Sequence, residues 1–313
     1  GADDNSSFAI NGNNLIINHI PNFEQKSTYI IRLSTTDQSN NVFSKGINLS
    51  VKDINESPFS VYLSNIKFNE NIISGSSIAT IYTGDLDSSD VHTYEFWNTQ
   101  QYVDNNFFNI INNKLLISTQ PNYEQKASYT IGLRSTDQGG LSHQDSMNLL
   151  VNNVNESPTS IAVSSNSFNE NVSENATVAT LSTTDEDVSD SHSYTLVSGS
   201  GDTDNGLFLI SGNSLKIQTS PNYETKSSYR VRVRTTDSSG ESYDKALILA
   251  VSDLNESPIS IAVSSNSFNE NISENATVAT LSTTDEDVSD SHTYTLVSGS
   301  GDTDNGLFLI SGN

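Results

Sequence analysis

The 313-residue sequence has no cysteine and few basic residues. The lack of cysteine excludes disulfide bonds, thiolate zinc sites and cysteine nucleophiles. Only 14 Lys and Arg residues stand against 38 Asp and Glu residues, which gives a formal net charge of −24 at pH 7. Such a charge argues against binding to nucleic acid or to an anionic membrane surface, because both need clustered lysine and arginine. The sequence also has no hydrophobic run near the roughly 18 residues of a membrane-spanning helix.

What the sequence does contain is a repeat of 100 residues. The segment Asn55–Pro58 recurs at 155–158 and 255–258, and residues 158–213 differ from 258–313 at only three positions. Internal repetition of this kind predicts modules joined in series. We expect residues 1–57 to be the C-terminal part of a truncated repeat, 58–157 and 158–257 to be complete repeats, and 258–313 to be the N-terminal part of another. The chain is then expected to be a piece of a longer array.

Within a repeat, the hydrophobic pattern is that of short strands. Tyr229, Val231 and Val233 alternate with three arginines, which is the period of two by which a strand buries one face. Clusters of Ser, Gly and Asp at 198–202 and 237–240 separate such segments. About seven short strands per repeat, with no helical period, predict an antiparallel β-sandwich.

Many acidic residues return at fixed places in each repeat. In residues 158–257 these places are Glu170, the pair Asp185 and Asp187, Glu224, Asp237, and the closing segment 253–256. Hard cations such as calcium take six to eight oxygen ligands from carboxylates, carbonyls and Asn side chains. Softer metals would need cysteine or clustered histidine. The acidic positions therefore favour a calcium site over a diffusely charged surface.

The acidic segments resemble the motifs of cadherin repeats. The segment Asp53–Pro58 is similar to the cadherin linker between domains, and 69–71 is similar to the Glu-Asn motif near the first strand. Residues 122–124, 85–87 and 136–138 are similar to the Asp-Arg-Glu, Asp-x-Asp and Ala-Asp-x motifs. The resemblance covers the whole chain and implies tandem Greek-key β-sandwich repeats, cadherin-like or immunoglobulin-like, of 100 residues. The Ser- and Asn-rich composition resembles cadherin-like repeats of very large bacterial surface and secreted proteins.

The resemblance also implies calcium ions at each junction between repeats. At 57/58 the implied ligands are Glu24, Asp53, Asn55, Glu56, Asp85, Asp87 and Asp137. At 157/158 they are Glu70, Asn122, Glu124, Asn153, Asn155, Glu156, Asp185, Asp187 and Asp237. At 257/258 they are Glu170, Glu224, Asp253, Asn255, Glu256, Asp285 and Asp287. Only the middle set is complete within the chain. Three departures from the motifs lower the charge or lengthen a ligand arm: Asn at 22, 122 and 222, Glu at 56, 156 and 256, and Asn at 153. They predict weaker binding, with two or three ions per junction.

The predicted function is that of a non-catalytic, calcium-binding spacer and adhesion array, extracellular or on the cell surface, which calcium makes rigid. Expected partners are other cadherin-like repeats in cis and a cell-surface protein or polysaccharide, with a membrane involved only through an anchor outside this fragment. The alternative is a polysaccharide-binding module of a secreted or surface protein, which exposed aromatic side chains on one face would favour. Trp97 is a candidate for stacking on a sugar, although a core position is favoured for it.

Two weaker patterns have simpler explanations. His92, His192 and His292 occupy one slot of the repeat and are expected to be exposed residues of a strand. The segment 202–206 begins like an EF-hand calcium loop, but it lacks the later acidic residues of that loop. A polar turn is expected there instead.

Overall fold

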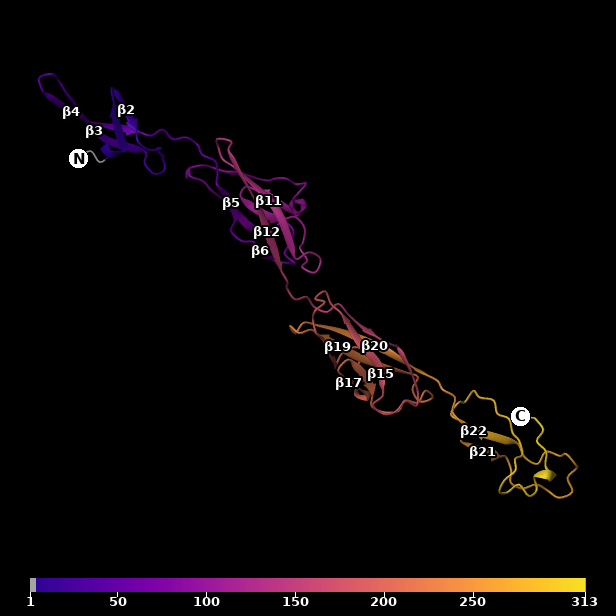
Figure 1. Cartoon of the computed structure of the whole chain (residues 1–313). Helices are drawn as coiled ribbons and strands as arrows, with labels where there is room; N and C mark the ends of the chain where they lie inside the picture. The colour runs from indigo at the N-terminus through magenta and orange to yellow at the C-terminus, as the bar shows by residue number, and fades with distance from the viewer. Residues whose placement is uncertain (1–3, 313) are drawn as a thin grey trace. The chain divides into compact units, whose positions relative to one another are not determined.

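The computed structural model describes residues 4–312, which are almost entirely strands and turns (Figure 1). The chain divides into two compact units, one that ends at Val154 and one that begins at Asn155. Each unit contains one complete sandwich and one partial repeat. Within the described residues, no helix has the length and apolar character needed to cross a membrane.

The first unit contains a sandwich of two four-stranded sheets. Its elements are β5 (Ser60–Leu63), β6 (Lys67–Asn69), β7 (Ser77–Gly84), β8 (Thr93–Phe96), the 3-10 helix η2 (Val103–Phe107), β9 (Phe108–Ile111), β10 (Lys114–Ile117), β11 (Ser128–Thr136) and β12 (Ser142–Asn152). The sheets have the orders β5-β7-β10-β9 and β6-β12-β11-β8. All neighbouring strands are antiparallel except β6 and β12, which are parallel. The chain passes repeatedly from one sheet to the other, as in a Greek-key sandwich.

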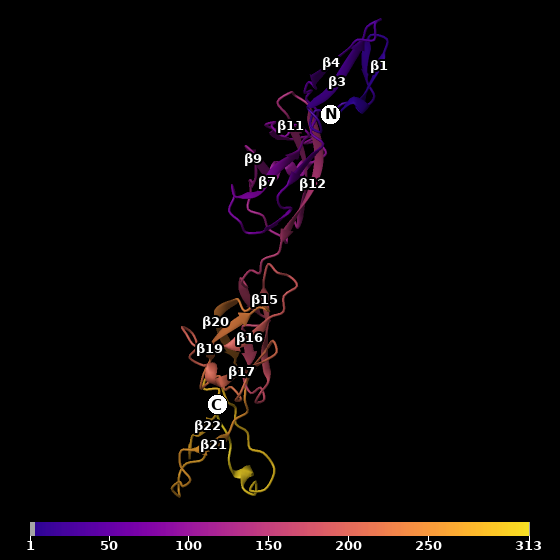
Figure 2. The same ribbon diagram turned by 90° about the vertical axis from the view of Figure 1, so that its left-hand side faces the viewer.

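The second unit repeats this topology (Figure 2). Its elements are β13 (Ser160–Val163), β14 (Ser167–Asn169), β15 (Thr177–Thr184), β16 (Ser193–Leu196), η3 (Asn205–Leu207), β17 (Phe208–Ser211), β18 (Ser214–Ile217), β19 (Ser228–Thr236) and β20 (Ser242–Ser252). The sheets are β13-β15-β18-β17 and β14-β20-β19-β16. The predicted β-sandwich is therefore confirmed. Each complete repeat has eight strands rather than about seven, because the short strands β6 and β14, which were not expected, pair in parallel with β12 and β20.

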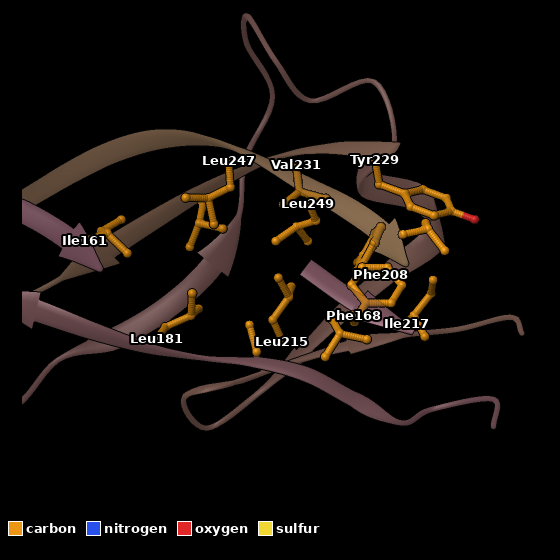
Figure 3. Packing of buried hydrophobic residues seen from close by; sticks show 14 residues of the cluster. Ile161, Phe168, Leu181, Phe208, Leu215, Ile217, Tyr229, Val231, Leu247 and Leu249 are labelled. Atoms are coloured by element: carbon orange, nitrogen blue, oxygen red, sulfur yellow. The ribbon is translucent and has the colours of Figure 1, made fainter. Parts of the chain in front are cut away.

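Each sandwich has its core between its two sheets, and Figure 3 shows the core of the second sandwich. Tyr229, Val231 and Val233 of β19 are buried, as the alternating pattern predicts. They face Leu215 of the opposite sheet, and the side chain of Leu215 has no exposed surface. Phe208 packs edge-on against Tyr229, with ring centroids 5.5 Å apart. A few well-placed apolar residues per strand thus suffice for a closed core in a sequence that is otherwise polar.

The partial repeats have strands but no comparable core. Residues 4–57 contain η1 (Asn5–Ser7), β1 (Phe8–Asn11), β2 (Asn14–Ile17), β3 (Thr28–Thr36) and β4 (Val42–Ser50), and residues 258–312 contain β21 (Ser260–Val263), β22 (Leu281–Thr284) and η4 (Asn305–Leu307). Ile261 is 67% exposed, whereas its counterpart Ile161 is 1% exposed. The difference arises because β21 and β22 have no second sheet against them. The division of the chain at 57/58, 157/158 and 257/258 stays a prediction.

Candidate metal centre

A buried glutamate closes the end of each complete sandwich. Glu170 directly follows β14, and its side chain is held by the backbone: Oε2 accepts from Tyr223 N at 2.7 Å and Oε1 from Leu254 N at 2.7 Å. Only 1% of Glu170 is exposed. Glu70 has the same two bonds, from Tyr123 N at 2.6 Å and Val154 N at 2.8 Å. These N–H groups offset the cost of burying the charged carboxylate and fix its direction.

The Asp-x-Asp motif forms a loop at the start of the sandwich, directly after β7 or β15. In the first unit, Asp85 Oδ1 accepts from Asp87 N at 3.1 Å, and Asp87 Oδ2 accepts from Glu56 N at 2.8 Å. The second bond joins the loop to the linker segment that precedes the repeat. Asp187 and Asp287 make the same contact, to Glu156 N at 2.9 Å and to Glu256 N at 2.7 Å.

Asp137 reaches the same end of the sandwich from the turn between β11 and β12. Its Oδ2 accepts from Asn55 Nδ2 at 2.9 Å, and its Oδ1 accepts from Leu141 N at 2.8 Å. Burial acts to raise the pKa of Asp137, but these donors outweigh it and lower the pKa. In the second unit, Asn155 Nδ2 donates to Asp237 Oδ2 at 3.0 Å, and this bond is the main reason that the pKa of Asp237 is lowered.

These elements bring carboxylate oxygens together around two of the predicted junctions. At 57/58, one oxygen each of Glu24, Asp53 and Asp87 lies within 4.8 Å of the others. At 257/258 the same holds for two overlapping groups, which are Glu170, Glu224 and Asp253, and Glu224, Glu256 and Asp287. The predicted ligands thus lie together in space although they come from segments of the chain that are far apart.

The residues predicted for the 157/158 junction belong to two units, and each unit has its own local arrangement. In the first unit, Asn153 Nδ2 donates to Glu124 Oε1 at 3.2 Å, close to the buried Glu70. The oxygen of Asn122 accepts from Gln125 N at 2.8 Å, so this predicted ligand also stabilises a local turn. In the second unit, the residues that belong to this set are Asn155, Glu156, Asp185, Asp187 and Asp237, with the contacts described above.

The electrostatics of the linker glutamates reflect this crowding of like charges. The pKa of Glu56 is raised, first by burial and then by the charges of Glu24 and Asp87. The pKa of Glu256 is raised by burial and by Glu170. Carboxylates that raise the pKa of one another in this way are stabilised by added positive charge.

Sequence reasoning missed one acidic residue of this region, Asp90. One of its oxygens lies within 4.8 Å of oxygens of Asp85 and Asp137. Its pKa is raised by burial and by Asp87, Asp137 and Asp85. The signal was present, because an aspartate recurs three residues after the second Asp of the Asp-x-Asp motif, at 90, 190 and 290.

The prediction for the repeated histidines was wrong. His92 and His192 lie in the loop before β8 and β16, and their side chains are only 11% and 14% exposed. Nε2 of each lies 2.8 Å from Oδ2 of the first Asp of the motif, Asp85 or Asp185. The chain turns between Asp87 and Asp90, where Asp90 N donates to Asp87 O at 3.0 Å, and this turn brings residues seven positions apart face to face. His292 makes the same contact with Asp285.

The donor chemistry of the 57/58 set fits a hard cation. Among the ion pairs of residues 4–312, none joins a lysine or arginine to its carboxylates. Two buried oxygens, Glu56 Oε2 and Asp90 Oδ2, have no hydrogen-bond partner in that part of the chain. Such atoms are costly unless a donor or cation satisfies them. An all-oxygen set of carboxylates and amides is the kind that calcium prefers.

The segment that resembled an EF-hand loop has a different role. Asp204 precedes η3, and its carboxylate accepts from Arg230 N at 2.7 Å and from Lys226 Nζ at 2.7 Å. Only 7% of Asp204 is exposed. The segment is thus a turn that ties η3 to β19, in line with the polar turn that was expected.

Known proteins similar to this chain include a large cadherin. In an alignment 267 residues long, the sequence is 26% identical to Protocadherin Fat 4 of the mouse, Mus musculus, and the match covers 81% of this chain and 5% of that protein. The chain thus spans about a twentieth of this relative. No protein-family model matches the sequence.

Solved structures of cadherin ectodomains have the same fold. The crystal structure of the Protocadherin GammaB4 extracellular domain matches with a TM-score of 0.60 and 21% identity, over 87% of this chain and 45% of that one. The Protocadherin gammaB7 EC3-6 cis-dimer structure matches with a TM-score of 0.59 and 17% identity, over 91% of this chain and 75% of that one. The bacterial context suggested by composition stays a prediction. The chain is an all-β protein built of tandem cadherin-like β-sandwich repeats.

Proposed function

We propose that the acidic ends of successive repeats form calcium sites that join the repeats into a rigid, non-catalytic spacer and adhesion array. The observation that carries this proposal is the pair of buried oxygens Glu56 Oε2 and Asp90 Oδ2, for which residues 4–312 provide no donor, in a carboxylate set that no lysine or arginine of those residues pairs with. On a purely structural acidic surface such oxygens would stay exposed to water, which avoids the free-energy cost of burying them without a partner.

The candidate ligands at 57/58 form two groups. Glu24, Asp53, Glu56 and Asp87 surround the linker, and Asn55, Asp85, Asp90 and Asp137 lie at the start of the following sandwich. Bound calcium would supply the positive charge that lets carboxylates from the partial repeat and from the complete repeat share one site. Two or three divalent ions would neutralise most of these seven carboxylates.

Hydrogen bonds within the chain preorganise the candidate ligands. Glu70 and Glu170 are held by two backbone N–H groups each, and Asp87 and Asp137 are held by the linker residues Glu56 and Asn55. These bonds fix the ligand oxygens before any ion binds, which lowers the entropy lost on binding. Repulsion among the same oxygens opposes a close junction, as the raised pKa of Glu56 indicates. Neutralisation of that repulsion is the proposed source of rigidity.

We place this function outside the cell or on its surface. The likeness to protocadherin ectodomains supports this location, and extracellular calcium would fill sites of modest affinity. The gammaB7 structure is a cis-dimer, which supports other cadherin-like repeats in cis as partners. A cell-surface protein as adhesion partner, and an anchor outside these residues as the link to a membrane, complete the proposal.

Calcium titration of the whole chain by calorimetry tests this function. The variant pair Asp187→Asn and Asp287→Asn, combined in one chain, removes two candidate ligand charges. The matched control, Glu174→Gln with Glu274→Gln, removes the same charge from exposed residues of the same two repeats. We expect wild type and control to bind calcium alike, and the Asp variant to lose most of the binding at its two junctions.

Small-angle scattering in calcium and in chelator tests the rigidity. In calcium, wild type should have a larger maximum dimension and a narrower range of conformations than in chelator. The same change should be much smaller for the Asp variant. A wild-type chain that takes up no calcium at millimolar concentration would contradict the proposal. So would an Asp variant that binds and stiffens like the control.

A further inference from the structure

One face of the first complete sandwich carries exposed aromatic side chains. Tyr62 on the edge strand β5 lies opposite Tyr82 on β7 in the strand register. Their rings stack with centroids 5.7 Å apart and planes at 26°. The two residues are 49% and 45% exposed. The pair therefore projects from the outer face of the sheet β5-β7-β10-β9, away from the core.

A third ring lies beside this pair. Phe59 is 60% exposed, and its N–H donates to Gly84 O at 2.9 Å at the end of β7. A Cβ at Gly84 would lie only 2.6 Å from a ring carbon of Phe59. The glycine thus makes room for the ring against the sheet. We call Phe59, Tyr62 and Tyr82 the aromatic face.

The fold does not require these rings. In the second sandwich, which has the same topology and register, the three positions are Thr159, Ala162 and Ser182, and position 84 is Thr184. Those side chains are small and exposed, yet that sandwich has an equally closed core. Three exposed aromatic residues that gather on one face of a sheet and contribute nothing to the core mark a site of interaction.

The charge around the aromatic face restricts the partner. The chain has a net charge of −24, but strands β5, β7, β9 and β10 contain no Asp or Glu. The exposed Lys114 on β10 donates from Nζ to Thr80 Oγ1 at 2.6 Å. The aromatic face therefore offers aromatic rings, hydroxyl groups and one ammonium group, and carboxylates lie only at its borders, where Asp145 Oδ2 accepts from Val61 N at 3.2 Å and Asp85 follows Gly84. It suits an uncharged partner rich in hydroxyl groups.

Trp97, a candidate for sugar stacking for which a core position was favoured, does not take part. Trp97 follows β8 in the opposite sheet, where it is half-buried. Its ring packs against Tyr102 with centroids 5.5 Å apart, and Tyr102 occupies the space that a side chain at Gly132 would need. Trp97 thus packs locally.

We propose that the aromatic face binds a neutral polysaccharide. The C–H groups on one side of a pyranose ring pack on an aromatic ring, while phenol, hydroxyl and ammonium groups bond to the sugar hydroxyls. An open sheet face suits a chain of sugars better than a small molecule, which needs a concave pocket. The strong negative charge of the protein disfavours an acidic polysaccharide. Three rings are too few for a stable contact between two copies of the chain, which needs about 1,000 Å² or more.

The test is affinity gel electrophoresis of the whole chain in the presence of soluble neutral glucans, xylans, mannans and galactans, followed by calorimetry with any that retard it. The test variant Tyr62→Ala with Tyr82→Ser installs the residues that the second sandwich has at these positions, so folding is preserved. The matched control is Tyr243→Ser, which removes an exposed tyrosine from β20. We expect the test variant to lose about tenfold or more in affinity, and the control to bind like wild type.

Several outcomes would overturn the proposal. These are a wild-type chain that none of the neutral polysaccharides retards, and a test variant that binds as well as wild type. Self-association of wild type in sedimentation that the test variant lacks would assign the face to a second copy instead. Binding should persist in chelator, so failure here and failure of the calcium proposal can be distinguished.

Discussion

Replacement of Glu170 by glutamine separates the structural role of this buried residue, which is to hold the end of the sandwich, from its proposed role as a calcium ligand. Its carboxylate accepts from Tyr223 N and from Leu254 N, each at 2.7 Å. Glutamine has nearly the same volume, but one of its terminal atoms is an NH2 group. One of the two backbone N–H groups would then face a donor, in a position that is 1% exposed.

The magnitude follows from that single lost bond. A hydrogen bond to a charged group contributes about 1.5–3 kcal/mol, and a buried N–H without a partner costs about 1–3 kcal/mol. The two figures overlap, because they describe the same broken contact. We therefore expect Glu170→Gln to lower the free energy of unfolding of its repeat by about 1.5–3 kcal/mol in the absence of calcium.

Glu256→Gln should behave differently. Glu256 Oε2 has no hydrogen-bond partner within residues 4–312, and burial and the charge of Glu170 raise the pKa of this group. Loss of its charge removes a repulsion, so stability in chelator should stay the same or rise. Both variants should bind calcium at the 257/258 junction about tenfold or more weakly, since each removes a ligand charge.

The assay is urea unfolding of the whole chain in chelator and in saturating calcium, with hydrogen exchange at the amides of Tyr223 and Leu254 as the local readout. Glu174→Gln, at an exposed position of the same repeat, is the control. A Glu170→Gln variant that unfolds in chelator at the same urea concentration as wild type would refute the reasoning. Equal destabilisation by Glu256→Gln would refute the distinction between a held and a repelled carboxylate.

Three further predictions concern the second sandwich. Burial acts to raise the pKa of Asp204, but hydrogen bonds from Lys226 and from Arg230 N outweigh it, so the folded-state pKa lies below the ordinary 3.8. The stabilisation by Asp204 is therefore present above pH 3.8 and is lost as pH falls through the folded-state pKa. Asp204→Asn should make the free energy of unfolding, measured in urea from pH 7 to pH 2, less dependent on pH. Leu215→Ala, at a position with no exposed surface, should cost about 3–5 kcal/mol in the same assay, and a loss below 1 kcal/mol would contradict the assigned core. His192→Ala should weaken calcium binding about tenfold in calorimetry, because the histidine holds Asp185 at 2.8 Å; unchanged affinity would show that the contact does not position this ligand.

The sequence by itself determined the features that depend on local chemistry. The alternation of Tyr229, Val231 and Val233 with arginines predicted a half-buried strand, because successive side chains point to opposite faces whatever the rest of the chain does. The 100-residue repeat predicted that one topology would recur. The recurring acidic positions, such as Glu170 and Asp287, predicted where carboxylate oxygens would gather.

Only the tertiary structure decided which distant residues meet. Asn55 contacts Asp137 across 82 positions, and the register of β5 and β7 places Tyr62 beside Tyr82. The role of His192 was misjudged because the alternation rule holds only along a straight strand, and the histidine lies beyond a turn that folds it back onto Asp185. Contacts of this kind depend on how sheets pack and loops turn, which pattern and spacing along the chain do not encode.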